Sequence, residues 1–219
     1  VKDLNNKLIR IIGDPLLRYE EDPVRMLRVI RFAAKLNFSI ETKTREAIVQ
    51  KAHLLAGVSN SRLFDEVTKL FHSGNSIKTL ALLREEDLFK YLFPFTAPLL
   101  ENDSKVEQLI NFTLESTDSR IKAKKPVTPA FFYAVFLWPT LLEETNLLQE
   151  KGLPLLVALE KAMNATLSKQ SKHISIPKRF TQAMREMWLL QLRLPKRLGT
   201  RAYKTLEHPR FRAAYDFLL

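Results

Sequence analysis

The chain has 219 residues with a formal net charge of +11, and 46% of its residues are hydrophobic. This apolar content supports a substantial core in one compact domain or two small ones, and it excludes a disordered chain. The sequence contains no cysteine, which excludes disulfide bonds and thiolate metal sites and favours the reducing cytoplasm. No apolar run approaches the roughly 18 residues of a membrane-spanning helix, and no signal-peptide pattern opens the sequence.

Residues 1–14 contain the one segment with clear strand character, "LIRII" at 8–12, which the turn residues "GDP" close. No second strand is predicted, so we expect this one to belong to a sheet outside the chain. The sequence begins at Val1 and reads from its start like the interior of a domain. We therefore expect the chain to be a piece of a longer protein.

Residues 15–93 predict a bundle of about five helices, because apolar residues recur at spacings of three and four. The first helix is expected at 22–36, with Asp22 as N-cap and Pro23 at the first helical position. The others are expected from 41 or 42 to 57, from 59 or 61 to 74, and as two short helices that end before Pro94.

The expected helix at 22–36 concentrates positive charge on one face. At 100° per residue its apolar residues share a broad arc, while Arg25, Arg28, Arg31 and Lys35 occupy the other face. This face is either an ordinary solvated one or a site for phosphates. A carboxylate such as Asp22 beside the Arg25 guanidinium has the donors and acceptors to read the edge of a base. Periodicity alone does not choose between these readings.

Residues 94–219 predict a second set of helices, at 103–118, 128–149, 154–170, 177–193, 199–206 and 209–218. The run "PAFFYAVFLWP" (129–139) is apolar on every side, which indicates a buried helix. A basic loop, "RIKAKKP" (120–126), joins the first two helices. No long linker separates the two halves, so we expect them to pack together.

The last quarter of the chain holds most of the excess charge, since residues 168–219 carry twelve Lys and Arg against three Asp and Glu. Such a segment is typical of a surface that faces a polyanion. Candidate phosphate contacts are Lys172, Lys178, Arg179, Arg193, Lys196, Arg197, Arg201, Lys204, Arg210 and Arg212. Aromatic residues such as Trp188 and Tyr203 lie among them, and each is either a core residue or a stacking surface for a base.

The stretch "DLNNKLIRIIGDPLLRYEEDPVRMLRVIRFAAKLNFSI" (3–40) resembles the junction of head and neck in class II nucleotidyltransferases, the family of bacterial poly(A) polymerases and CCA-adding tRNA nucleotidyltransferases. The resemblance rests on E-D-x-x-R followed by M-L-R-x-x-R-F-A-A. "SRLFDEVTKLFHSG" (61–74) resembles the next motif of the family. "LFPF", "TPAFFYAVFLWP" and "LEHPRFRAAYD" are similar to the poly(A) polymerase branch. The resemblance covers nearly the whole chain and is strongest at 3–40 and 175–216.

This resemblance implies a division of the all-α chain into a head-domain remnant (1–14), a helical neck (15–93) and an RNA-binding body (94–219). It implies that Asp22 and Arg25 read the base of the incoming nucleotide and that Arg28 and Arg31 lie near its triphosphate. Glu21, Arg62 and Glu66 would be structural residues of the motifs. ATP would be the substrate.

The catalytic head of the family, with its D-x-D carboxylates for Mg²⁺, has no counterpart in this sequence. Two-metal nucleotidyl transfer requires those carboxylates, so we expect this chain to bind without catalysing and to hold no metal or cofactor of its own. The resemblance implies RNA 3′ ends as partners, RNA helicases or degradation machinery as further ones, and a monomer. The alternatives are a CCA-adding enzyme and a non-enzymatic helical RNA-binding module.

Overall fold

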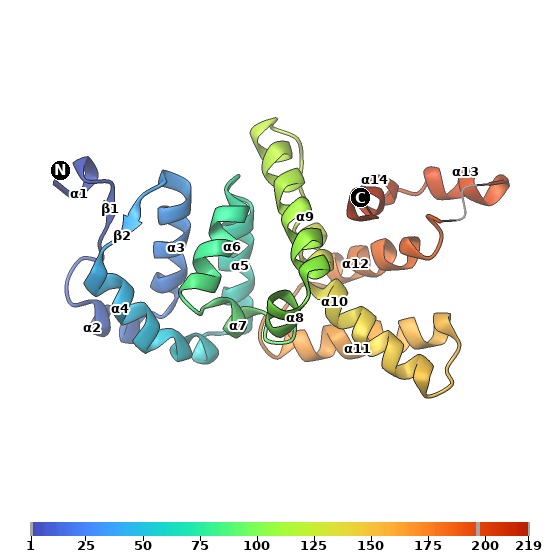
Figure 1. Cartoon of the computed structure of the whole chain (residues 1–219), viewed down its shortest axis with the longest axis horizontal. Helices are drawn as coiled ribbons and strands as arrows, with labels where there is room; N and C mark the ends of the chain where they lie inside the picture. The colour runs from blue at the N-terminus through green and yellow to red at the C-terminus, as the bar shows by residue number, and fades with distance from the viewer. Residues whose placement is uncertain (1, 196–197, 219) are drawn as a thin grey trace.

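The computed structural model describes residues 2–195 and 198–218. The N-terminal elements lie at one end of the long axis of the molecule and α13 lies at the other, with α9 and α10 between them (Figure 1). The N-terminal elements are α1 (Lys2–Asn5), β1 (Leu8–Ile9), α2 (Pro15–Glu21), α3 (Val24–Leu36) and β2 (Ser39–Ile40). The next ones are α4 (Thr42–Lys51), a 3-10 helix η1 (Ala52–Gly57), α5 (Asn60–Phe71), α6 (Ser76–Glu85) and α7 (Phe89–Leu92).

The second half continues with α8 (Ala97–Asn102), α9 (Ser104–Lys122), α10 (Pro129–Glu150), α11 (Leu155–Ser171), α12 (Lys178–Gln191), α13 (Thr200–Leu206) and α14 (Phe211–Leu218). The predicted all-α class is confirmed, and most predicted helices agree with the observed ones to within a few residues at either end. The apolar run at 129–139 forms the first half of α10, where most of its side chains are buried as predicted.

The expectation that the first strand has no partner in this chain was wrong. β1 pairs in parallel with β2, with Leu8 opposite Ser39 and Ile9 opposite Ile40. Asn37 makes this possible because its left-handed backbone (φ 55°) ends α3 and turns the chain back toward β1. A strand of two residues is too short to produce an alternating hydrophobic pattern, so periodicity does not predict β2.

The start of the arginine helix also differs from the prediction. Residues 15–21 form a separate helix, α2, whose first amides are capped by the side chain of Asp14. Asp22 lies in extended conformation between α2 and α3, and α3 begins only at Val24. The Asp22 carboxylate still accepts a hydrogen bond from the Val24 amide at 3.3 Å. Asp22 is therefore a junction residue that belongs to neither helix.

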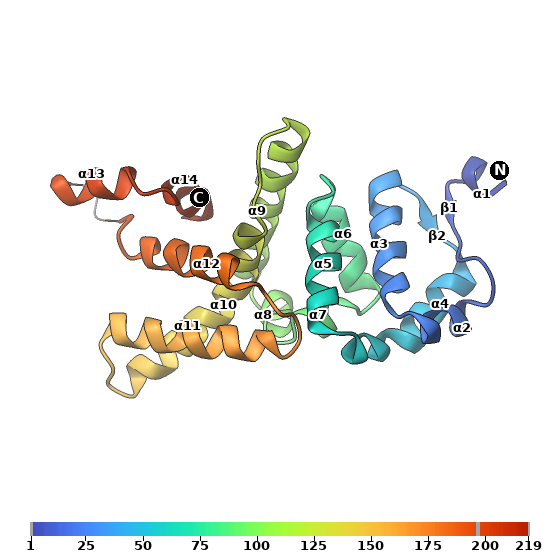
Figure 2. The same cartoon turned by 180° about the vertical axis from the view of Figure 1, so that it is seen from behind.

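One hydrophobic core runs through both halves of the chain, with α10 at its centre. The ring of Phe136 on α10 lies 4.9 Å from that of Phe93, and Tyr133 lies 5.6 Å from Phe64 on α5, measured between centroids. Trp188 on α12 is fully buried and donates its indole N–H to the Ala134 carbonyl at 3.0 Å. The two halves pack together as expected (Figure 2). The functional division near residue 94 stays a prediction, since no break in the core marks it.

Candidate functional site

The predicted nucleotide-binding residues lie along the contact between α3 and α5. The two helices run in the same direction, because Asp22 meets Arg62 at one end of the contact while Arg31 meets Glu66 further along. Both helices are amphipathic and bury one face against the core. Several of their charged residues lie at the edge of the helix pair, where they form a row of ion pairs.

At the beginning of this row, each of the two predicted base-reading residues is bonded to another residue. The Asp22 carboxylate accepts a hydrogen bond from Arg62 at 2.9 Å. Arg25 donates to the Glu21 carboxylate at 2.7 Å and to the Arg18 carbonyl at 2.9 Å. The bond from Arg25, together with the nearby charge of Arg18, holds the pKa of Glu21 below its ordinary value. Arg25 thus fastens the end of α2 to the start of α3.

In the middle of the row, three cations surround one buried carboxylate. The Glu66 side chain is 6% exposed, and its oxygens lie 3.6 Å from Arg28, 3.6 Å from Arg31 and 2.9 Å from Lys69. The two arginine contacts are longer than hydrogen bonds, so Coulomb attraction holds these guanidiniums without using their N–H donors on Glu66. Three positive charges against one negative charge leave an excess that attracts anions. Arg28 is the more exposed arginine and Arg31 the more buried one.

The site contains two cations that were not among the predicted residues. Lys69 lies three residues after Glu66 on the same helix, a spacing that itself indicates an ion pair. Arg18 shares the Glu21 carboxylate with Arg25, at 2.6 Å. Its role could not be seen from the sequence, because α2 was not predicted as a helix of its own.

The predicted RNA-binding residues fall into two regions of the structure. Lys172, Lys178 and Arg179 are exposed where α11 leads into α12, beside the start of α5. Two hydrogen bonds fix that position: the Ser175 amide donates to the Asn60 carbonyl at 3.1 Å, and the Asn60 side chain donates to the Ser171 carbonyl at 2.9 Å. This first basic region is therefore close to the helix that carries Arg62, Glu66 and Lys69.

The second basic region lies further along α12 and beyond it. Arg210 contacts Glu186 at 3.3 Å, eight residues or about 12 Å along the helix from Lys178. Arg193, Lys204 and Arg212 are exposed on the segments that follow α12. Of the other predicted residues, Lys196 and Arg197 lie outside the described residues, as does the side chain of Arg201. Tyr203 is 70% exposed, whereas the buried Trp188 belongs to the core.

The part of the chain that the structure describes does not fit a metal site. Within residues 2–195 and 198–218, no group of three or more His, Asp or Glu side chains could hold a metal ion. We assign no metal-dependent step to these residues. Over the same ranges, no helix is long and apolar enough to cross a membrane.

Two protein-family models match the chain. Residues 37–100 match the model described as "Probable RNA and SrmB- binding site of polymerase A", and residues 151–219 match "Polymerase A arginine-rich C-terminus". Poly(A) polymerase I of Salmonella typhi is 47% identical over 221 aligned residues, which cover 100% of this chain and 48% of that protein. The chain thus spans about half the length of the curated poly(A) polymerases it matches.

CCA-adding enzymes match less of the chain in sequence but share its fold. The enzyme of Geobacillus sp. (strain WCH70) is 36% identical over 116 residues, covering 52% of this chain and 28% of that protein. The solved structure of the Thermotoga maritima CCA-adding enzyme complexed with tRNA superposes with a TM-score of 0.66 at 18% identity. That alignment covers 100% of this chain and 49% of that one.

Proposed function

Because the chain belongs to the family of bacterial poly(A) polymerases and CCA-adding enzymes, we propose that it is the neck and RNA-binding body of a poly(A) polymerase. The whole enzyme would add AMP from ATP to RNA 3′ ends and so promote RNA decay. The observation that carries this proposal is the 47% identity to poly(A) polymerase I, which extends over the full chain. In this proposal residues 1–14 join a catalytic head, 15–93 form the neck and 94–219 form the body, and the enzyme works in the cytoplasm.

The geometry of the neck supports a role in holding the nucleotide. Arg28, Arg31 and Lys69 would contact the triphosphate, since their combined charge exceeds that of Glu66 and both arginines keep N–H donors for oxygen ligands. Asp22 and Arg25 would read the base at the beginning of the same row. ATP would supply the adenylyl group. The carboxylates and Mg²⁺ that promote its transfer would belong to the head, so these neck residues bind and orient the nucleotide.

The two basic regions support a path for the RNA. The first region, at Lys172, Lys178 and Arg179, is fixed beside α5 and would hold the 3′ end near the neck. The second region, around Arg193, Lys204, Arg210 and Arg212, would hold nucleotides further upstream. Contacts of this kind neutralise phosphates, so binding would weaken steeply with salt and depend little on sequence. RNA helicases or degradation enzymes would be further partners.

The alternative within the family is a CCA-adding enzyme. Tailing activity separates the two. We expect the whole polymerase, meaning this chain joined to its catalytic head, to extend an unstructured RNA into a long tail when ATP is the only nucleotide. This 219-residue chain alone serves as the control and should leave the same RNA unextended. Addition limited to CCA on a tRNA would contradict the proposal. A parent protein without a catalytic head would instead indicate a non-enzymatic RNA-binding module.

A further inference from the structure

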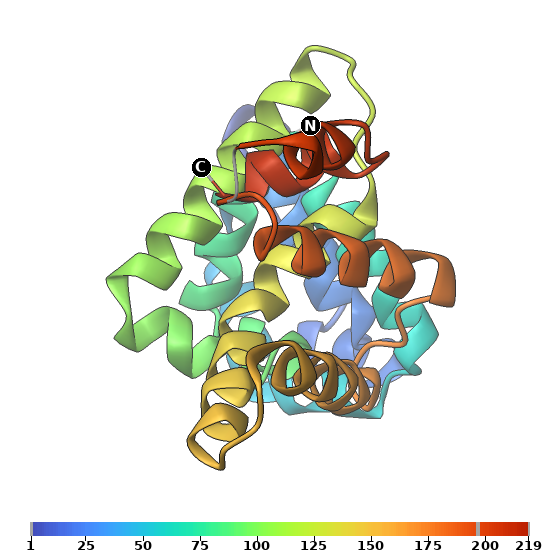
Figure 3. The ribbon, with the colours of Figure 1, turned by 90° about the vertical axis from the view of Figure 1, so that its right-hand side faces the viewer.

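A cavity of about 290 Å³ opens between the end of α9, the loop that follows it, α12 and α14. Viewed from the C-terminal end of the molecule, α14 lies next to both α9 and α12 (Figure 3). Part of the cavity lining comes from residues 120–128, which lie outside the basic last quarter of the chain. Its volume is near the lower end of the roughly 300–1,000 Å³ that small-ligand sites enclose.

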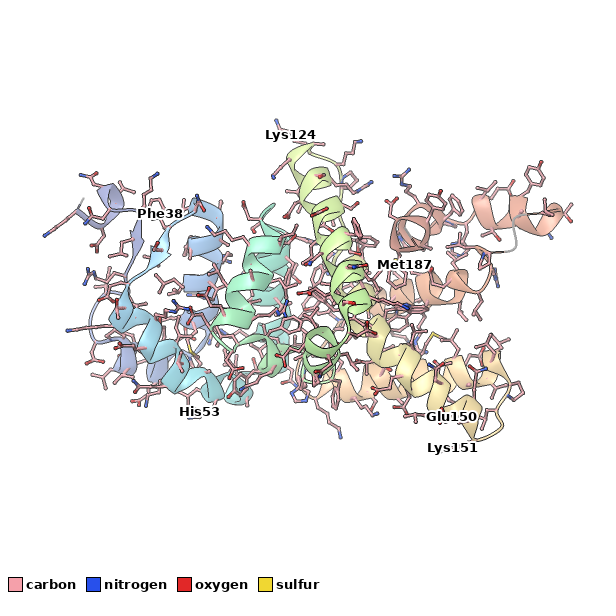
Figure 4. All side chains as sticks on the ribbon, in the orientation of Figure 1. Phe38, His53, Lys124, Glu150, Lys151 and Met187 are labelled. Atoms are coloured by element: carbon pink, nitrogen blue, oxygen red, sulfur yellow. The ribbon has the colours of Figure 1, made fainter. Side chains whose placement is uncertain are left out.

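The cavity combines an apolar floor with a basic rim. Phe131, Ala183 and Met187 contribute to the floor, and Met187 is labelled on α12 in Figure 4. The rim carries Arg120, Arg210 and Arg212. An apolar surface beneath several guanidinium groups is the environment in which proteins hold an unstacked nucleobase.

Hydrogen bonds restrain all three of these guanidinium groups, and the one from Arg210 goes to Glu186 at 3.3 Å. Arg212 donates to the Asp216 carboxylate at 3.0 Å, although its side chain is 75% exposed. Arg120 donates to the Pro126 carbonyl at 3.2 Å and lies 4.0 Å from the same Asp216 carboxylate. Asp216 is therefore shared by arginines from α9 and α14. A guanidinium that is already held in position loses less conformational entropy when a flat base packs against it.

The loop beside the cavity adds positive charge near the place where the phosphate of a bound nucleotide would lie. Lys122, Lys124 and Lys125 are all exposed at the end of α9 and in the loop, and Figure 4 shows Lys124 at the tip of that helix. A bound base in the cavity would thus have basic side chains nearby for its backbone. This charge favours a nucleotide over an apolar peptide side chain.

We propose that the cavity accepts one unpaired nucleotide of the bound RNA, with its base between the apolar floor and the guanidinium of Arg212. The proposal rests on the RNA-binding function proposed above. It extends that function, because a cavity for an unpaired base selects single-stranded RNA. A base that is paired in a duplex cannot enter. Phosphate contacts alone would not distinguish the two forms of RNA in this way.

The test measures the affinity of the 219-residue chain for a labelled single-stranded RNA and for a duplex of the same length. Arg212→Lys keeps the charge and removes the planar guanidinium. We expect it to weaken single-strand binding about tenfold, the effect of losing one stacked base, and to change duplex binding by less than about twofold. The matched control is Arg185→Lys on α12, whose side chain donates to Asn164 at 2.7 Å and does not line the cavity. This control should change neither affinity.

The outcomes separate the cavity from the general RNA-binding function. If Arg212→Lys binds the single strand as tightly as the parent chain, or loses the same factor for both RNAs, the cavity proposal is wrong while the RNA-binding function stands. If the parent chain binds neither RNA, the proposed RNA-binding function itself fails. Adenosine, which carries no phosphate, is added as a competitor. We expect adenosine to leave the labelled RNA bound. If adenosine displaces the RNA when the two are at equal concentration, the cavity is a nucleoside site and the assignment to RNA is wrong.

Discussion

The arginines of α3 differ from one another in the hydrogen bonds and ion pairs that they make within the chain. Arg25 donates from one guanidinium nitrogen, Nη1, to both Glu21 and the Arg18 carbonyl, so this nitrogen is held at the junction of α2 and α3. Arg28 and Arg31 approach Glu66 only to 3.6 Å and share it with Lys69. A new anion would therefore be bound more readily by Arg28 and Arg31 than by Arg25.

Replacing Arg28 and Arg31 together by Gln should raise the KM for ATP in the whole polymerase by about 100-fold or more, because each charge-assisted hydrogen bond contributes about 1.5–3 kcal/mol. RNA affinity should change little, since the first basic region lies on the α11–α12 segment. Steady-state kinetics with varied ATP, together with an RNA-binding assay, measure both effects. Arg185→Gln removes one charge elsewhere as the control. An unchanged KM with weakened RNA binding would place these arginines on the RNA.

The sequence could predict the charged face of α3 but only part of what surrounds it. The pair between Glu21 and Arg25 bridges the junction of α2 and α3, so it does not follow from the spacing of a single helix. The contacts from Arg28 and Arg31 to Glu66 depend on how α3 packs against α5, and a single sequence contains no direct record of that packing. The family motif suggested that Glu66 is structural. That it serves as a shared counter-ion became visible only in the fold.

Among the helices, α6 depends on a cap supplied from a distant part of the chain. Its own N-cap residue, Asn75, makes no side-chain capping bond. The buried carboxylate of Asp118 on α9 instead accepts from the Ser76 amide at 2.8 Å and from the Ser76 hydroxyl at 2.7 Å. This contact joins the first half of the chain to the second through the end of one helix.

Asp118→Ala should lower the free energy of unfolding by about 2–3 kcal/mol, because it leaves the buried Ser76 amide without its acceptor, while the Ser76 hydroxyl keeps only the Leu114 carbonyl at 3.2 Å. Asp103→Ala is the matched control. Asp103 caps α9 at an exposed position, accepting from the Lys105 amide at 2.8 Å, and its loss should cost about 1 kcal/mol. Urea denaturation of both variants measures the difference. Equal losses would show that the Asp118 contact adds nothing beyond an ordinary cap.

Helix periodicity was a good guide to the elements, and its failures have local causes. The long helices of the second half were predicted nearly to their ends because their apolar residues repeat over many turns. The parallel pair of β1 and β2 and the separate helix α2 were not predicted. Each depends on a few residues: the left-handed Asn37 before β2, and Asp14 capping α2. Such short elements are specified by turn and cap geometry more than by periodicity.

At the scale of the molecule, charge and core are distributed differently along the chain. The excess positive charge belongs largely to residues 168–219, and the structure divides the predicted RNA-binding residues there between two regions. The buried core, by contrast, extends from Tyr19 to Phe217 as one cluster. The proposed neck and body are therefore functional regions built on a common core. Each would lose packing if the other unfolded.

This continuity predicts that the chain unfolds in a single cooperative transition. Both tryptophans, Trp138 and Trp188, lie in the second half, so their fluorescence reports on residues 94–219, whereas far-UV circular dichroism reports on the helices of both halves. We expect the two signals to change at the same urea concentration. Phe136→Ala should cost about 3–5 kcal/mol and shift both signals together, because the ring contacts Phe71, Phe89 and Phe93 from the first half. A fluorescence transition that separates from the circular dichroism transition would show instead that neck and body are independent folding units.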